Sequence, residues 1–556
     1  MERHDAAVSL LASQVRQFYE RKTPFRIYHG STTSTREYQY LPDNMVDTSK
    51  LSNVLSVDSR SRMALVEPNV PMDKLVEATL PFRLVPPVIM EFPGITAGGG
   101  FAGTSGESSS FRHGFFERTV NSIEMVLANG EIIKASSTEN SDIFYGAASS
   151  FGTLGVTTLL EIQLIDATSF VELTYYPVSS VQAAVQKIEE ATADLSNDYL
   201  DGILFAKDRG VICVGRMKDT IERGIRVQRF TRSTDPWFYL HAKKLIAKSN
   251  EPVTEAIPLV DYLFRYDRGG FWVGAYAFRY FLTPFNRVTR WALDTYMHTR
   301  VMYHALHKSG LAKSYILQDV AVPYEGAAEF VDYLDESFGH YPIWLCPLHQ
   351  TGKSESSPRG LTALKADPNA ATMILNFGVW GPGPTKRRTF VSANRNMEQK
   401  VHELKGQKCL YAHAYYTEDE FWDIYDRKEY DGLRAKYDAS YLPSVYDKVK
   451  VDIVAEERAA KESLIAWLLA TFWSIWPLGG LYGFFHAALG GDYLIRRGTK
   501  FPMAPSTIRD HSQIEKDENG SSGGRVSLHQ MYIHFAEILL YLLGVTESLC
   551  RFATSE

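Results

Sequence analysis

A tract rich in glycine and serine constrains the fold of this chain more than any other feature. Gly98-Gly99-Gly100-Phe101-Ala102-Gly103 matches G-x-G-x-x-G, and Glu124 follows about 20 residues later, as in a dinucleotide fingerprint. That fingerprint needs a hydrophobic strand before the glycines and an apolar helix directly after them. Here Phe92-Pro93-Gly94 precedes the tract and the polar residues 104–110 follow it, and such residues form helices poorly. We therefore do not expect a Rossmann crossover.

The alternative is a long loop whose backbone binds a pyrophosphate. Glycines let a ligand approach closely, and successive N–H groups with Thr and Ser hydroxyls bind phosphate oxygens. A second small polar stretch, residues 28–35, would supply further N–H donors. On composition alone, a flexible surface loop that binds nothing remains an alternative interpretation of this tract. The sequence contains no G-x-x-x-x-G-K-[ST], which excludes a P-loop.

Short strands and helices surround this tract. Asn129-Gly130 between two apolar runs predicts a tight hairpin, because both positions accept positive φ. Apolar residues at helical spacing predict an amphipathic helix over 5–20, which packs on the following domain or, alternatively, binds a membrane surface. Further on we expect strands at 26–28, 63–66, 156–165, 171–176, 202–205, 211–214 and 409–416, and helices at 72–79, 142–149, 181–195, 288–307 and 418–426.

Charge and cysteine content narrow the class of protein. The 556 residues carry a net charge of −6, so no basic excess is available to bind nucleic acid. Four cysteines form neither a disulfide framework nor the short paired spacing of a zinc site, which makes a reducing compartment the default and predicts no metal. Charged residues at positions 2–5 interrupt any signal peptide.

The C-terminal part is unusually apolar. Residues 464–490 contain no Asp, Glu, Lys or Arg, and as one helix they would be about 40 Å long, more than a bilayer core needs. Pro477 and Gly479-Gly480 lie in the middle of this segment. Three structures are therefore compatible with it: one kinked membrane span, a hairpin that enters the membrane and returns, and a pair of helices buried in the protein. Basic residues at 496, 497 and 500 are typical of a cytosolic flank, and residues 531–545 predict an interfacial helix.

Several blocks together resemble a known family. The flavin-domain blocks are 96–110, Ala128-Asn129-Gly130, 139–145 and Gly152-Thr153-Leu154-Gly155. They resemble the FAD-binding domain of the vanillyl-alcohol oxidase / p-cresol methylhydroxylase superfamily. Collinear blocks further on, among them Tyr341-Pro342-Ile343-Trp344-Leu345-Cys346-Pro347 and Val445-Tyr446-Asp447-Lys448, are more narrowly similar to the Δ24-sterol reductases. The resemblance covers about residues 24–450. The chain differs from the family pattern in two respects: it lacks the N-terminal membrane segment, and its residues 29–34 have a different sequence.

The resemblance implies an α+β fold with a p-cresol methylhydroxylase-type FAD-binding domain, a mixed α/β cap domain and an apolar C-terminal membrane tail. The corresponding boundaries are 1–23 for the N-terminal helix, 24–167 for the FAD-binding domain, 168–390 for the cap, 391–454 for the C-terminal part of the catalytic unit and 455–556 for the tail. It also implies FAD as cofactor and NADPH as reductant. No second dinucleotide motif is visible, so NADPH is expected to visit the flavin face transiently.

The same match assigns the cofactor contacts. His29 is also, by position, a candidate for a covalent bond to the flavin, as some superfamily members have. The implied FAD-binding residues are Tyr28, His29, Gly30, Ser31, Thr32, Thr96, Gly98, Gly99, Gly100, Gly103, Thr104, Gly106, Glu107, Ser108, Gly152, Thr153 and Gly155.

The resemblance to sterol reductases implies that the substrate is an isolated trisubstituted alkene. Such a double bond is not polarised, so its reduction needs a protein acid in a dry pocket as well as a hydride. On a strand over 409–416, Tyr411, His413 and Tyr415 would share one face, which makes them candidate catalytic residues. A structural Tyr/His ladder is the alternative. Glu420 and Asp319 are further candidates, and Trp344 and Trp380 are either pocket wall or core.

The expected function is reduction of the Δ24 side-chain double bond of a sterol or related triterpenoid or prenyl lipid. The alternatives are a flavin-dependent oxidase or dehydrogenase of a lipid alcohol and a non-catalytic lipid-binding scaffold. We expect association with a membrane, that of the endoplasmic reticulum, with the catalytic part facing the cytosol.

Overall fold

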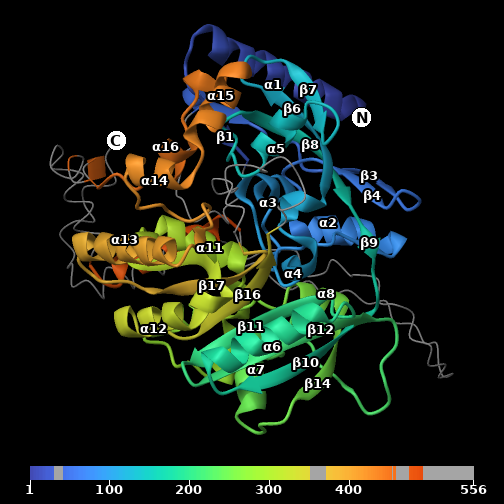
Figure 1. Ribbon diagram of the computed structural model, residues 1–556, viewed down its shortest axis with the longest axis vertical. Coiled ribbons are helices and arrows are strands. Elements are labelled where there is room, and N and C mark those ends of the chain that lie inside the picture. The colour runs from blue at the N-terminus through green and yellow to red at the C-terminus, as the bar shows by residue number, and fades with distance from the viewer. Residues whose placement is uncertain (30–41, 351–370, 454, 457, 459–474, 492–556) are drawn as a thin grey trace, which may run out of the picture. The chain divides into compact units, whose positions relative to one another are not determined.

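The computed structural model describes residues 1–29, 42–350, 371–453, 455–456, 458 and 475–491. The chain divides into two units, Met1–Pro502 and Met503–Glu556, and the second lies wholly outside the described residues. Two large sheets organise the first unit (Figure 1).

The chain begins with helix α1 (Glu2–Glu20), as the apolar spacing predicted. Its buried face packs against β2 (Met45–Asp47) and β6 (Val120–Leu127). His4, at its start, is buried and contacts Glu67 at 2.9 Å and Glu124 at 3.2 Å. The helix is therefore part of the core of the first half, and its apolar face, formed by Val8, Leu11, Ala12, Val15 and Phe18, is buried.

An antiparallel five-stranded sheet forms this half, in the order β3-β4-β8-β6-β7. The predicted hairpin joins β6 to β7, and Gly130 adopts φ +87° in its turn. Beside the sheet lie a parallel pair, β1 with β2, and short helices. The bounds are β1 Arg26–Tyr28, β3 Val54–Asp58, β4 Met63–Val66, β7 Ile132–Ser136, β8 Gly155–Gln163, α2 Met72–Thr79, α3 Ala97–Gly103, α4 Ser110–His113 and α5 Ser141–Ala147.

A nine-stranded, largely antiparallel sheet forms the second half, in the order β13-β14-β10-β12-β11-β16-β17-β15-β18. Alternate residues of its strands face opposite sides. Leu345 and Phe377 belong to the core under α6, α12 and α13, whereas Trp344 and Cys346 belong to the core shared with the first half. The bounds are β10 Phe170–Val178, β11 Tyr199–Ala206, β12 Arg209–Lys218, β13 Arg226–Val227, β14 Val253–Pro258, β15 Tyr315–Pro323, β16 Ile343–His349, β17 Met373–Pro382, β18 Gln407–Lys408, α6 Val181–Ala193, α12 Ala327–Ser337 and α13 Arg387–Glu403.

After α13 the chain returns to the first half. Helix α14 (Glu418–Ile424) is followed by α15 (Arg427–Lys436) and α16 (Val445–Val449). Helix α15 packs on α5, and the Tyr441 hydroxyl donates to the Ala128 carbonyl at 2.7 Å. In Figure 1 orange α15 lies beside blue α1 and the five-stranded sheet. Helix α15 and Tyr441 thus help to complete the half in which the chain began.

Two predicted elements are wrong. The helix expected over 288–307 is split into α10 (Arg287–Ala292), a 3-10 turn and α11 (Thr299–Lys308). His298, extended at φ −84° and ψ 144°, interrupts it because its ring bonds to Asp267 at 2.5 Å. The strand expected over 409–416 is not formed: β18 ends at Lys408, and Ala414 makes only an isolated bridge to Lys450. The buried Glu398 carboxylate accepts from the Tyr415 N–H, so at this residue a side chain takes the place of a neighbouring strand.

The described part of the apolar segment forms helix α19 (Leu478–Leu489), which starts directly after Pro477. It packs on α11 with a face of small residues, Gly479, Gly480, Gly483 and Ala487. A Cβ at Gly483 would lie 2.3 Å from the Ala305 carbonyl oxygen, so only glycine permits this approach. Residues 464–474 and 531–545 lie outside the described residues. Among the described residues no helix combines the length and the apolar character needed to cross a membrane.

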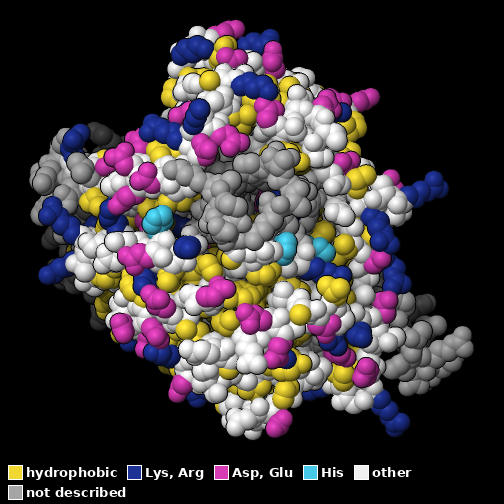
Figure 2. Space-filling model, viewed as in Figure 1, with side chains coloured by type: hydrophobic (Ala, Val, Ile, Leu, Met, Phe, Trp, Pro, Cys, Tyr) yellow, Lys and Arg dark blue, Asp and Glu magenta, His cyan; other side chains and the backbone are white. Residues whose placement is uncertain are grey.

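The face seen in Figure 2 carries acidic and basic side chains together. Lys and Arg are interspersed with Asp and Glu around its edge, and hydrophobic side chains are visible between them. On this face the described residues therefore form no extended field of one sign.

Candidate active site

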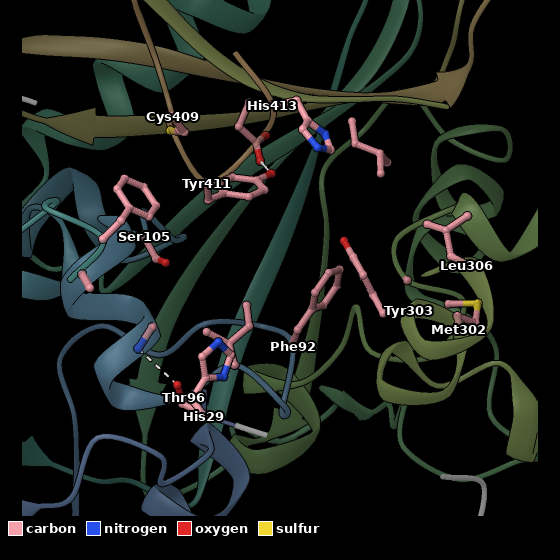
Figure 3. A pocket seen from close by; sticks show the side chains of 18 of the residues that line it. His29, Phe92, Thr96, Ser105, Met302, Tyr303, Leu306, Cys409, Tyr411 and His413 are labelled. Carbon is pink, nitrogen blue, oxygen red and sulfur yellow. Dashed lines mark hydrogen bonds between the residues drawn. The ribbon is translucent and has the colours of Figure 1, made fainter. Parts of the chain in front are cut away.

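A cavity of about 680 Å³ lies where the two halves meet. This volume falls in the range of small-molecule sites, roughly 300–1,000 Å³. Its wall is polar where the glycine tract lines it and largely apolar where α11 and α19 line it. Figure 3 shows His29, Thr96 and Ser105 on one side, Met302 and Leu306 on another, and Tyr411 and His413 above them. The cavity therefore offers two different environments within one space.

The glycine tract does not form the open loop that we expected. Residues 97–103 form helix α3, and Thr96 caps it by accepting the Gly99 N–H at 3.1 Å. The Gly98 and Gly100 amides donate to the carbonyls of Pro68 and Thr96. These first amides are therefore already bonded within the protein, and the cavity receives residues 102–107, where Thr104 turns the chain at φ +53°. No strand leads into the helix, which agrees with the rejection of a Rossmann crossover.

Most of the predicted cofactor residues line the cavity. These are His29, Thr96, Gly98, Gly99, Gly103, Thr104, Gly106, Glu107, Gly152 and Gly155. Four predicted residues do not line it: Tyr28, Gly100, Ser108 and Thr153. Gly100 packs closely inside the protein, since a Cβ there would meet Met90 and Phe116. Thr153 accepts a hydrogen bond from the Tyr430 hydroxyl. Gly30, Ser31 and Thr32 lie outside the described residues.

The polar end fits a polar cofactor. A Cβ on Gly103 would meet only Phe151, at 3.8 Å, so glycine here leaves the cradle open. Glu107 lines the cavity, and its buried Oε2 has no hydrogen-bond partner among the described residues. A buried acceptor of this kind is costly unless a donor from a ligand satisfies it. The residues present are therefore those that a cofactor with N–H and O–H donors would complete.

A lysine on helix α16 supplies positive charge at the glycine-lined end of the cavity. Lys448 on α16 lines the cavity, and its Nζ donates to the Phe151 carbonyl at 2.6 Å, beside Gly152. Burial and the charge of Lys448 lower the pKa of His29, so that imidazole is neutral. Lys448 belongs to the block Val445-Tyr446-Asp447-Lys448 that carries the family resemblance, but it was not among the predicted cofactor residues.

Three aromatic side chains of the second half line the apolar region. The Phe271 ring centroid lies 4.5 Å from that of Trp380 and 5.3 Å from that of Trp344. All three are buried and face the cavity. Trp344 and Trp380, left open as wall or core, are both wall residues.

An acid pair lies at the cavity surface. The Tyr411 hydroxyl donates to Asp319 Oδ2, and Asn376 Nδ2 donates to Oδ1 at 3.3 Å. Burial raises the pKa of Asp319 to about 6, although these two hydrogen bonds oppose the shift. Burial and the neighbouring carboxyl raise the pKa of Tyr411. Figure 3 shows the Tyr303 hydroxyl pointing into the space below this pair. Because Asp319 is buried, the arrangement can hold a proton at the cavity surface.

The other catalytic candidates are separated. His413 lines the cavity, but Tyr415 lies in the core beneath α13 and does not. The prediction that Tyr411, His413 and Tyr415 share one face is wrong, because residues 409–416 do not form a strand. Glu420 caps α14 and pairs with Arg395 at 2.8 Å, as an ordinary ion-pair and cap residue would.

A second buried charge network went unnoticed in the sequence. Asp201 Oδ2 accepts from Arg265 at 2.8 Å, Tyr266 at 2.8 Å and Trp344 at 3.1 Å. Arg265 also contacts Glu91 at 3.5 Å, and burial raises the pKa of Glu91 to about 8 against the opposing charge of Arg265. Glu91 lines the cavity, and a lone carboxyl within the apolar run 88–92 was the signal that could have revealed it.

Comparison with known proteins agrees with this site. An FAD binding domain family matches residues 8–136, which contain the glycine tract. The Delta(24)-sterol reductase of Rattus norvegicus is 29% identical over 463 residues, covering 80% of this chain and 86% of its own. Those of Pisum sativum and Arabidopsis thaliana are each 30% identical, covering 73% of this chain and 76% of theirs. This chain belongs to the Delta(24)-sterol reductase family.

Membership in the Delta(24)-sterol reductase family confirms the resemblance found in the sequence. FAD is the cofactor that this family fold takes, and the glycine-lined end of the cavity lies in the matched domain. The aligned lengths extend well beyond residues 8–136, so the likeness to the reductases includes the second half, which supplies the apolar wall and the Asp319–Tyr411 pair.

Proposed function

We propose that this protein is an FAD-dependent reductase that saturates the Δ24 side-chain double bond of a sterol or related triterpenoid or prenyl lipid, with NADPH as reductant. Family membership supports the reaction class. The observation that carries the proposal is the Asp319–Tyr411 acid pair, which lies in the same cavity as the cofactor cradle and the aromatic wall.

An alkene without a neighbouring carbonyl accepts a hydride only when a proton is delivered to its other carbon. When bound and reduced by NADPH, the flavin would supply a hydride for the more substituted carbon. Tyr411 would donate its hydroxyl proton to the less substituted carbon, and protonated Asp319 would return a proton to the tyrosine oxygen. The rings of Phe271, Trp344 and Trp380 would stabilise positive charge that develops at the tertiary carbon. The apolar wall of α11 and α19 would exclude water.

The chain's own residues would also hold the cofactor. Residues 102–107 and Gly152 would approach it closely, and Lys448 would offset its diphosphate charge. Glu107 would accept a hydrogen bond from it. His29 stays a candidate for covalent attachment, which denaturation followed by a test for released flavin would decide.

Anaerobic photoreduction tests the reaction. We expect the reduced, flavin-loaded protein to reoxidise when a Δ24 sterol is added, and mass spectrometry to find a product heavier by two hydrogens. A saturated sterol of the same ring system is the control and should leave the flavin reduced. Flavin that stays reduced with the alkene, or oxygen consumption with a lipid alcohol and no NADPH oxidation, would reject the proposal.

We also propose attachment to a membrane, that of the endoplasmic reticulum, with the catalytic part facing the cytosol. The sequence supports it: 464–490 is uncharged and basic residues follow at 496, 497 and 500. Fractionation of cells that express the tagged chain, followed by protease protection, tests both parts. A tag in a carbonate-washed supernatant would contradict the attachment.

A further inference from the structure

Helix α10 and the turn before it expose an unusual amount of apolar surface. No residue of α10 is buried, and Val288 and Trp291, one turn apart, are 69% and 56% exposed. Leu282 in the preceding turn is 75% exposed. A stable surface helix normally turns its apolar side chains inward. This one presents them to the outside.

A second apolar segment lies against the same turn. The indole Nε1 of Trp476 donates to the Tyr280 carbonyl at 2.8 Å, two residues before Leu282. Ile475 and Trp476 are themselves 51% and 55% exposed. Residues far apart in the sequence therefore join in one surface. We call Leu282, Phe285, Val288, Trp291, Ile475 and Trp476 the apolar rim.

Along the two segments that carry the apolar rim, every charged residue is basic. Between residues 269 and 293 the sequence contains Arg279, Arg287 and Arg290 and no Asp or Glu, and residues 475–491 contain none of the four charged types. The Arg290 guanidinium lies 4.8 Å from the Phe285 ring centroid. Large apolar side chains, Trp and Arg together are the composition of a surface that enters the headgroup layer of an anionic membrane.

The apolar rim borders the cavity. Tyr280 and Phe281, which precede Leu282, line the cavity, as do Gly480 and Phe484 of α19. The Gly480 N–H donates to the Tyr280 hydroxyl at 3.3 Å, and the Tyr296 and Phe484 rings lie 4.9 Å apart. The elements that carry the rim are therefore also the apolar end wall of the site.

We propose that the apolar rim docks on an anionic lipid bilayer and that substrate enters the cavity from the bilayer between α9 (Val273–Tyr280), α11 and α19. The inference rests on the proposed function, because a bilayer is where a lipid substrate resides. Charge favours this occupant over a second copy of the chain: two rims would bring like charges together, whereas anionic lipid complements the arginines.

Hydrogen–deuterium exchange on the full-length, FAD-loaded protein gives a local test. We expect vesicles of phosphatidylcholine and phosphatidylserine to protect residues 282–293 and to leave the exposed segment around Leu195 unchanged. Absence of protection at 282–293 would overturn the proposal even if the protein binds vesicles through another segment. Protection that rises with protein concentration in the absence of lipid would instead assign the surface to a second copy.

A double variant, Val288→Ser with Trp291→Ser, tests the entry route. We expect the apparent KM for sterol in vesicles to rise about tenfold, since two apolar side chains leave the lipid. The rate with sterol carried by cyclodextrin should not change, because neither residue touches the cavity. Leu195→Ser, which replaces a leucine 81% exposed, is the matched control. An equal KM for vesicle sterol in the variant and control would overturn the entry route, whereas loss of the cyclodextrin reaction in all proteins would count against the proposed function alone.

Discussion

At the scale of single residues, the proposed chemistry depends on a proton held by Asp319 and Tyr411. Burial raises the pKa of Asp319 to about 6, so the fraction of protonated carboxyl falls as pH rises above that value. We expect the rate at which a Δ24 sterol reoxidises the flavin to fall between pH 5 and pH 8 with an inflection near 6. Single-turnover stopped flow on pre-reduced protein measures it.

The variants Tyr411→Phe and Asp319→Asn separate the two groups. Loss of a positioned acid costs about 10²- to 10⁴-fold in rate, so Tyr411→Phe should slow the single turnover by at least about a hundredfold. Asp319→Asn should remove the inflection near pH 6. Sterol binding to the oxidised protein should persist in both variants. A normal rate in Tyr411→Phe would show that the proton comes from elsewhere, with Glu91 the next candidate.

Lys448 permits a prediction that does not depend on turnover. Because a hydrogen bond to a charged group contributes about 1.5–3 kcal/mol, Lys448→Met should weaken FAD binding by about ten- to a hundredfold. Fluorescence titration of the apoprotein with FAD measures the affinity. Lys207→Met, which removes an exposed lysine paired with Asp332, is the control and should bind FAD normally. Equal affinities for the two variants would contradict the role of Lys448.

At the scale of elements, the break between α10 and α11 makes stability depend on pH. Burial lowers the pKa of His298, but the carboxylates of Asp267 and Asp294 outweigh burial and raise it to about 10. A raised pKa means that the folded state binds the proton more tightly, so this stability is complete below about 6.5 and is lost as pH rises toward 10. We expect the free energy of unfolding to fall from pH 7 to pH 10, and to fall less in His298→Gln. The control is His402→Gln, at an exposed histidine on α13. Parallel curves for His298→Gln and the parent would contradict the assignment.

The contact between α19 and α11 gives a second test at this scale. Gly483→Ala places a Cβ 2.3 Å from the Ala305 carbonyl oxygen and should lower the free energy of unfolding by about 1–3 kcal/mol. Gly432→Ala on α15 meets nothing within 4 Å, so the same change should be neutral or stabilising there. Urea denaturation compares them. Equal stabilities would mean that α19 moves aside at little cost.

Elements with a local signal were predictable from the sequence, and elements fixed by distant partners were not. The Asn129-Gly130 hairpin and the periodic helices α1 and α2 carry their signal within a few residues, and they were confirmed. The strand over 409–416 failed because distant partners bond its backbone: the Glu398 carboxylate at Tyr415 and residues 449–451 at Ala414. The helix over 288–307 failed because Asp267 holds His298. Family motifs located the cofactor tract, and a lone carboxyl in an apolar run could have pointed to Glu91, but Tyr303 reaches the cavity only through the fold.

At the scale of the whole molecule, one hydrophobic core runs from Val8 through both sheets to Leu442. The domain boundaries drawn from the sequence remain predictions, but a continuous core favours one cooperative transition. Five of the nine tryptophans, Trp237, Trp272, Trp291, Trp344 and Trp380, belong to the second half, so the fluorescence reports mainly that half, whereas flavin release reports the first. We expect both signals to change at the same denaturant concentration. Flavin release well before the tryptophan change would indicate independent halves.

The position of α19 has a consequence for biosynthesis. The glycine tract is translated early, yet the end wall of the chamber is made of residues 478–489. A nascent chain must therefore extend past residue 489 and clear the ribosome before that wall can close, so a complete catalytic chamber forms late in synthesis, however early the nucleotide fold appears.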